Sequence, residues 1–194
     1  MALSWQHTRV FDSINSTIDI AQGFNGNGSF GSRINENTNF LKYNLTASYN
    51  RYFNRRNNLL LSVNAQYTTS KLPLSEMFIV GGLSSVRGFD QAQELGDKGY
   101  TLSAEWFYHP DIKNKYLHNA LQLGLFLDNG TASTNKPVPG EKKSITLTGG
   151  GTEIIANIEK RYFARVCVGF PINSSVSTEK QTTHIYAFIG AKIW

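Results

Sequence analysis

This chain of 194 residues carries a net charge of +5, has one cysteine and contains no run of 18 apolar residues. These properties exclude a transmembrane helix, an internal disulfide and a cysteine-based zinc site. The basic residues are scattered and form no continuous strip, which argues against nucleic acid as a partner.

The first eight residues have the pattern of a strand interior. They lack the basic start and the apolar stretch of a signal peptide. We therefore expect the natural start of the polypeptide to lie upstream.

Apolar and polar residues alternate along most of the chain, which is the period that predicts β-strands. In the stretch from Leu121 to Asp128 the leucines occupy every odd position, and polar or small residues fill most even ones. Most such runs reach about 9–11 residues, the length that a tilted strand needs to cross a bilayer. Nine antiparallel strands are predicted, at residues 2–11, 14–23, 38–53, 57–70, 98–108, 118–129, 144–158, 161–171 and 183–194.

The predicted connections alternate in length. Short ones follow Phe11, Phe53, Tyr108 and Ile158, and long ones span 24–37, 71–97, 130–143 and 171–182. Short turns on one side and long loops on the other are typical of outer-membrane barrels. Aromatic residues near the strand ends suit the girdles of such a barrel, although a soluble β-sandwich alternates too and remains an alternative. These aromatic residues are Trp5, Tyr49, Tyr67, Tyr100, Trp106, Tyr108, Tyr162 and Trp194.

The loop over residues 71–97 is too long for a hairpin turn and carries Val86-Arg87-Gly88-Phe89. An arginine in a narrow lumen must be paired, and its planar fork suits a carboxylate. Alternation places Glu105 and Asp128 on the inward faces of two adjacent strands, with Phe126 on the same face as Asp128. We expect the loop to fold into the lumen and Arg87 to meet these acids.

Val86-Arg87-Gly88-Phe89, Glu105 and Phe126-Leu127-Asp128 together resemble the barrel of bacterial outer-membrane protein translocators. Their surroundings are most similar to two-partner secretion transporters of the haemolysin activation/secretion type. In that pattern Arg87 corresponds to the loop arginine, Phe126-Leu127-Asp128 to the Phe-x-Asp motif, and Glu105 to the acid between them.

The resemblance implies an all-β transmembrane barrel in the outer membrane of a Gram-negative bacterium. It implies no cofactor and no catalysis. The partners would be the lipid bilayer and a large secreted exoprotein such as a haemolysin, an adhesin or a toxin. The alternatives are an outer-membrane insertase of the same superfamily and a passive porin.

The resemblance also implies a barrel of about sixteen strands preceded by POTRA domains. Nine strands match only its C-terminal part, so we expect residues 1–194 to be that part, with both edge strands paired to strands absent here. The last residue, Trp194, has the opposite parity to the apolar set of its strand.

Other candidate sites have simpler explanations. The four histidines, His7, His109, His118 and His184, show no metal-ligand spacing. No helix follows the glycine-rich stretch 23–28, so we expect an outer loop rather than a phosphate site. Glycines 149–151 predict a bulge or a close approach to the inserted loop. Glu105 and Asp128 could act as acid and base, but the arginine already accounts for both. Cys167 is expected to fill space on the inward side.

Overall fold

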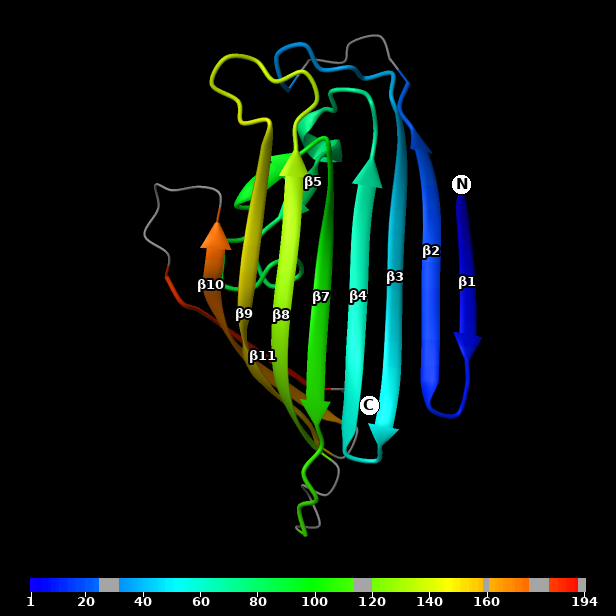
Figure 1. Ribbon diagram of the computed structural model, residues 1–194, viewed down its shortest axis with the longest axis vertical. Coiled ribbons are helices and arrows are strands. Elements are labelled where there is room, and N and C mark those ends of the chain that lie inside the picture. Colours follow the sequence, from blue (N-terminus) through cyan, green and yellow to red (C-terminus); the bar gives the residue numbers. More distant parts are fainter. Residues whose placement is uncertain (25–31, 114–119, 159–160, 175–181, 192–194) are drawn as a thin grey trace.

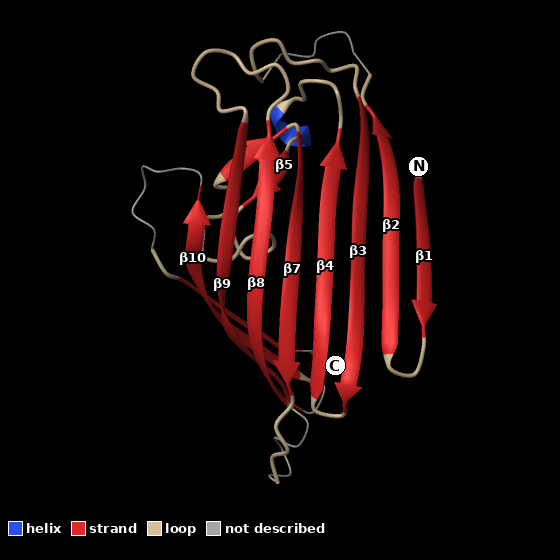
Figure 2. Cartoon of the chain, viewed as in Figure 1, coloured by secondary structure: helices blue, strands red, loops and turns tan. Residues whose placement is uncertain are grey.

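The computed structural model describes residues 1–24, 32–113, 120–158, 161–174 and 182–191, and these form an almost purely β structure (Figure 1, Figure 2). Nine strands build one antiparallel sheet in the order β1-β2-β3-β4-β7-β8-β9-β10-β11. The predictions of an all-β class and of nine long strands are therefore confirmed. The strands are β1 (Ala2–Thr8), β2 (Asp12–Gln22), β3 (Leu41–Asn54), β4 (Asn57–Tyr67), β7 (Lys98–Tyr108), β8 (Leu121–Ser133), β9 (Ser144–Ile158), β10 (Tyr162–Ser174) and β11 (His184–Ala191).

The loop between β4 and β7 has secondary structure of its own, which the sequence did not predict. A single 3-10 turn (Leu74–Glu76) leads into β5 (Phe78–Val80), which pairs with β6 (Glu94–Gly96) in a separate two-stranded sheet. Three-residue strands are too short to show a period of two. The pairing brings the two ends of the loop together and directs the segment between them back toward the main sheet.

β8 and β10 run furthest past their predicted ends. β8 continues past residue 129 to Ser133 because Gly130 and Ala132 face inward beneath Val80 and Val86 of the loop. β10 continues through Pro171, where the pairing with β9 shifts register, an irregularity at which a residue without an N–H is tolerated. Residues 118, 119 and 192–194, which the sequence assigned to strands, lie outside the described residues, and so does Trp194.

The sheet is curved but does not close on itself within the described residues, and β1 and β11 are its edges. Figure 1 shows β1 to β4 and β7 to β9 standing side by side, with β10 and β11 bending away behind them. The long connections gather at one end of the strands, here called the loop end, and the hairpins β1–β2 and β3–β4 turn at the other. No helix among the described residues is long and apolar enough to cross a membrane.

The two faces of the sheet differ. We call the face that carries loop 71–97 the inner face, and its apolar core consists of Val80, Val86, Phe89, Ala132, Ile145 and Leu147. On the outer face Leu123, Leu125 and Leu127 are 42%, 60% and 54% exposed, as the alternation predicted. No second sheet covers this apolar face among the described residues, so the structure does not support the soluble sandwich.

Candidate functional site: a loop held on the inner face

The tip of loop 71–97 lies directly on the backbone of β9 and β10. Gly88 has φ +96, a conformation that residues with a Cβ seldom adopt, and a side chain there would meet the Phe170 backbone. On the strand side, a Cβ at Gly149 would collide with the carbonyl oxygen of Arg87. Of the glycines 149–151, Gly149 therefore marks the close approach of the loop, whereas a Cβ at Gly151 would meet the Phe126 ring and the Val168 backbone. The pairing of β9 with β8 stays in register across all three.

Asp128 holds Arg87 with three hydrogen bonds. The guanidinium donates from Nε to Oδ2 at 2.7 Å and from Nη2 to Oδ1 at 2.8 Å, which is the bidentate arrangement that fits a carboxylate. The Arg87 backbone N–H also donates to Oδ2 at 3.1 Å. Arg87 is 3% exposed and Asp128 is fully buried, so water does not screen this pair.

Strand β7 supplies a second acid and a hydroxyl. Arg87 Nη2 donates to Glu105 Oε1 at 2.8 Å and to Ser103 Oγ at 3.1 Å, and Ser103 in turn donates to Asp128 Oδ1 at 2.6 Å. The guanidinium carbon lies 3.6 Å from the centroid of the Phe126 ring, in cation–π geometry. The structure thus brings together the loop residue and the three wall residues that the sequence singled out. Val86 and Phe89, on either side, lie in the apolar core.

Two further charged residues belong to the cluster, and the sequence analysis missed them. Arg165 of β10 binds Glu153 of β9. The Arg165 atoms Nε and Nη2 lie 2.7 Å and 2.6 Å from Oε2 of Glu153. The other oxygen, Oε1, lies 3.7 Å from Arg87 Nη1 and accepts no hydrogen bond within the described part of the chain. The alternation of inward and outward positions could have identified both residues. Glu153 pairs with the inward-facing Cys167, and Arg165 lies two residues before that cysteine on the same face.

The loop tip also bonds to the last strand. Tyr186 Oη of β11 donates to the carbonyl oxygen of Phe89 at 3.1 Å, and His184 Nε2 lies 2.9 Å from Asp90 Oδ1. Cys167, on the adjacent strand β10, is fully buried, as expected for an inward-facing filler.

A separate polar network holds the loop end, outside the sheet. Arg33 Nη1 donates to Asp97 Oδ1 at 2.7 Å, and Asp97 also accepts from the backbone N–H groups of Leu72 and Asn135. Lys71 Nζ lies 2.8 Å from Glu141 Oε2, and the hydrogen bond from Lys71 is the main reason that the pKa of Glu141 is lowered. Three loops of the chain are thus joined at this end.

The remaining candidates do not gather into one site. His109 lies 2.8 Å from the Asn58 amide oxygen, and His184 contacts Asp90. Within the described ranges no group of three or more His, Cys, Asp or Glu side chains is placed to hold a metal ion. His118 and most of the glycine-rich stretch 23–28 lie outside those ranges. The arrangement around Arg87 fixes the loop to the inner face of the sheet.

Comparison with known proteins points to one family. The family model described as haemolysin secretion/activation protein ShlB/FhaC/HecB matches residues 1–155. The heme/hemopexin transporter protein HuxB of Haemophilus influenzae is 23% identical over 144 residues, which cover 72% of this chain and 25% of HuxB. The chain thus spans about a quarter of the length of the curated relatives that it matches.

Two solved structures share the fold. CdiB from Escherichia coli matches 97% of this chain and 35% of its own, with a TM-score of 0.76 and 19% identity. CdiB from Acinetobacter baumannii matches 97% of this chain and 32% of its own, with a TM-score of 0.72 and 17% identity.

Proposed function

Because this chain belongs to the haemolysin secretion/activation family ShlB/FhaC/HecB, we propose that it forms part of the wall of an outer-membrane pore that exports a large secreted protein. In this proposal residues 1–194 are the C-terminal portion of a barrel, and loop 71–97 lies inside the lumen. The observation that carries the proposal is the Arg87 cluster, which fixes a 27-residue loop to the inner face of the sheet rather than leaving it outside.

The loop covers only one half of the inner face. Its tip and core contact β7 to β11. At the loop end Lys42 of β3 and Gln66 of β4 bond to Glu76, and the remaining inner positions of β2 to β4 are not covered by the loop. A polar cavity of about 240 Å³ beside the loop tip is lined by Ser84 and Ser85 of the loop and by inner positions of β4 and β7. We propose that the exported chain passes along this open half, and that Arg87 sets how far the loop stands from it.

The open half is polar but almost uncharged, which supports passage of an unfolded polypeptide. Amide and hydroxyl side chains can bond to any backbone, and they hold no particular sequence through charge. The two charged exceptions are already occupied: Lys42 lies 2.9 Å from Glu76, and Asp19 accepts from Asn44 at 3.2 Å. The uncharged polar side chains at these inner positions include Ser13, Asn15, Thr17, Asn44, Thr46, Ser48, Asn50, Asn58, Ser62 and Asn64, and Ala21 and Leu60 are the apolar ones.

Comparison of the culture medium of the parent strain, a deletion strain and a complemented strain tests the proposal. We expect one or a few large proteins to disappear from the medium on deletion, to return with the unaltered gene, and to remain absent with Arg87→Ala. An unchanged medium contradicts export. If the outer membrane instead loses several unrelated barrel proteins, the protein acts as an insertase.

A further inference from the structure

The outer face of β8 and β9 changes character toward the loop end. Three cross-strand pairs there join polar side chains: Asn129 to Thr148, Thr131 to Thr146 and Ser133 to Ser144, each at 2.9 Å. We call these three pairs the hydroxyl ladder. The inward residues of the same stretch, among them Ala132, Ile145 and Leu147, are buried against the loop, so the ladder lies on the opposite, outer side.

The ladder begins where the apolar band of the outer face ends. Leu127, Leu125 and Leu123 follow one another down β8, and Tyr100 of β7 lies directly beside Thr131. A tyrosine at such a border is typical of the aromatic girdle of a membrane barrel. The ladder therefore lies at the level of lipid headgroups and not of lipid tails.

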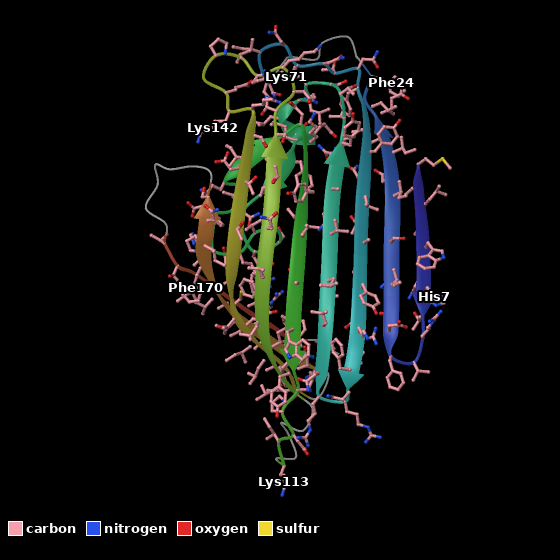
Figure 3. The ribbon with its side chains drawn as sticks, viewed as in Figure 1. His7, Phe24, Lys71, Lys113, Lys142 and Phe170 are labelled. Carbon is pink, nitrogen blue, oxygen red and sulfur yellow. The ribbon has the colours of Figure 1, made fainter. Side chains whose placement is uncertain are left out.

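Lysines surround the upper rung of the ladder. Lys98 pairs across the strands with Ser133, while Lys142 and Lys143 immediately precede Ser144 and are exposed. None of the three forms an ion pair with a described carboxylate. The nearby Glu141 binds Lys71 and Arg33, and Lys98 Nζ lies 6.0 Å from the centroid of the Tyr67 ring. Figure 3 shows Lys142 at the loop end and Lys113 at the opposite end of the molecule.

Below the ladder the outer face is hollowed. A depression of about 650 Å³ extends from β2 to β9 across the outer face and is lined mainly by apolar side chains, among them Ala47, Leu61, Val63, Leu102, Ala104 and Leu127. Its lining includes Asn129 and Thr148, the lowest rung of the ladder. Small residues leave this space: Ala47 pairs with Val63, and Ala104 pairs with Leu61 and Leu127.

We infer that the hollow, the ladder and the three lysines form one binding site for a phosphorylated, acylated glycolipid of the outer leaflet. An acyl chain fills the hollow, the sugar hydroxyls bond to the ladder, and a phosphate lies against Lys98 and Lys143. Charge complementarity favours this ligand over a second copy of the chain, because basic side chains from two copies would face one another. The inference rests on the outer-membrane location proposed above, but not on protein export.

The test uses the protein extracted from outer membranes and placed in bilayer discs of neutral phospholipid. Bis-phosphorylated lipid A and its dephosphorylated form are titrated in, and the lipid retained per protein is measured by mass spectrometry. We expect tight, saturable binding of the phosphorylated form only. The double variant Lys98→Gln/Lys143→Gln should weaken it by roughly tenfold or more, since each surface lysine contributes appreciably to attraction of an anionic headgroup.

Two further variants make the result specific. Ala104→Trp fills the hollow and should reduce binding while the lysines stay in place, whereas Lys113→Gln at the opposite end should have no effect. Each variant is folded if it migrates as the compact, folded band on a gel when the sample has not been heated. Equal retention of both forms of lipid A, or full binding by the double variant, overturns the proposal. The proposal is also overturned if the variants change the oligomeric state of the protein but not the amount of bound lipid.

Discussion

Arg87 is the residue on which the position of the inner loop depends most. Its guanidinium satisfies Asp128 and Glu105 and lies within 3.7 Å of Glu153, so its loss leaves buried carboxylates without compensation. Removing one partner of a buried ion pair costs about 3–5 kcal/mol. We predict that Arg87→Ala abolishes export and lowers the temperature at which the folded band disappears on an unheated gel.

Two companion variants make this prediction specific. Arg87→Lys should recover little, because an ammonium group cannot bind a carboxylate with a planar fork. Arg56→Ala is the control, since Arg56 and Asp111 form an exposed pair at the other end of the strands, where such a pair contributes about 0–1 kcal/mol. Full export by Arg87→Ala would show that the cluster is not needed for function.

The close approach of the loop depends equally on Gly149. A methyl group there would collide with the Arg87 carbonyl, and the strand backbone cannot give way without breaking the pairing of β8, β9 and β10. We predict that Gly149→Ala displaces the loop tip and exposes the otherwise buried Cys167 to a maleimide reagent. Gly190→Ala is the matched control, because nothing lies within 4 Å of a Cβ at that position. Equal labelling of the two variants contradicts the contact.

At the scale of the elements, the loop-end network should respond to acid. The pKa of Glu141 is lowered, chiefly by its hydrogen bond from Lys71, so the folded state binds its proton less readily than the unfolded state does. The stabilisation is therefore fully present above the unfolded pKa of about 4.3 and is lost as the pH falls through the lower, folded value.

We predict that a spin label at Lys142 is ordered at neutral pH and becomes mobile only as the pH falls below about 4, which electron paramagnetic resonance can follow. With Glu141→Gln the label should already be mobile at neutral pH and should respond little to acid. A label that behaves identically in both proteins excludes a role for this carboxylate in ordering the loop.

Strand β4 allows a direct test of which face meets lipid. Val63 lines the apolar hollow on the outer face, and its neighbour Asn64 lines the polar cavity on the inner face. In a Cys167→Ser background, we predict that the Asn64→Cys variant reacts rapidly with a charged, water-soluble thiol reagent and that the Val63→Cys variant hardly reacts. Similar rates at both positions would contradict the barrel wall.

At the scale of the whole molecule, the two free edges decide behaviour in a membrane. β1 and β11 have no outer neighbour among the described residues, and a lipid bilayer offers no hydrogen bonds to their backbones. We predict that the 194-residue chain, expressed alone in detergent, aggregates or pairs edge to edge with another copy. Light scattering after gel filtration measures this. A monodisperse monomer that forms a stable pore would show that these strands close by themselves.

The amino-acid sequence determined the local features of this protein. Strict alternation in β8 decides that Leu123, Leu125 and Leu127 face one way and Asp128 the other, because successive side chains of a strand point to opposite faces. The need of a buried arginine for a carboxylate was also foreseeable, since it depends on charge and on the alternation of inward and outward positions alone.

Only the tertiary structure decided where the loop lies. The extension of β8 to Ser133, the short strands β5 and β6, and the part played by Glu153 and Arg165 all follow from the packing of the loop across β7 to β11. Such contacts join residues up to 97 positions apart, as between Phe89 and Tyr186. A periodicity within one strand reports which face a side chain occupies, and long-range packing alone determines what covers that face.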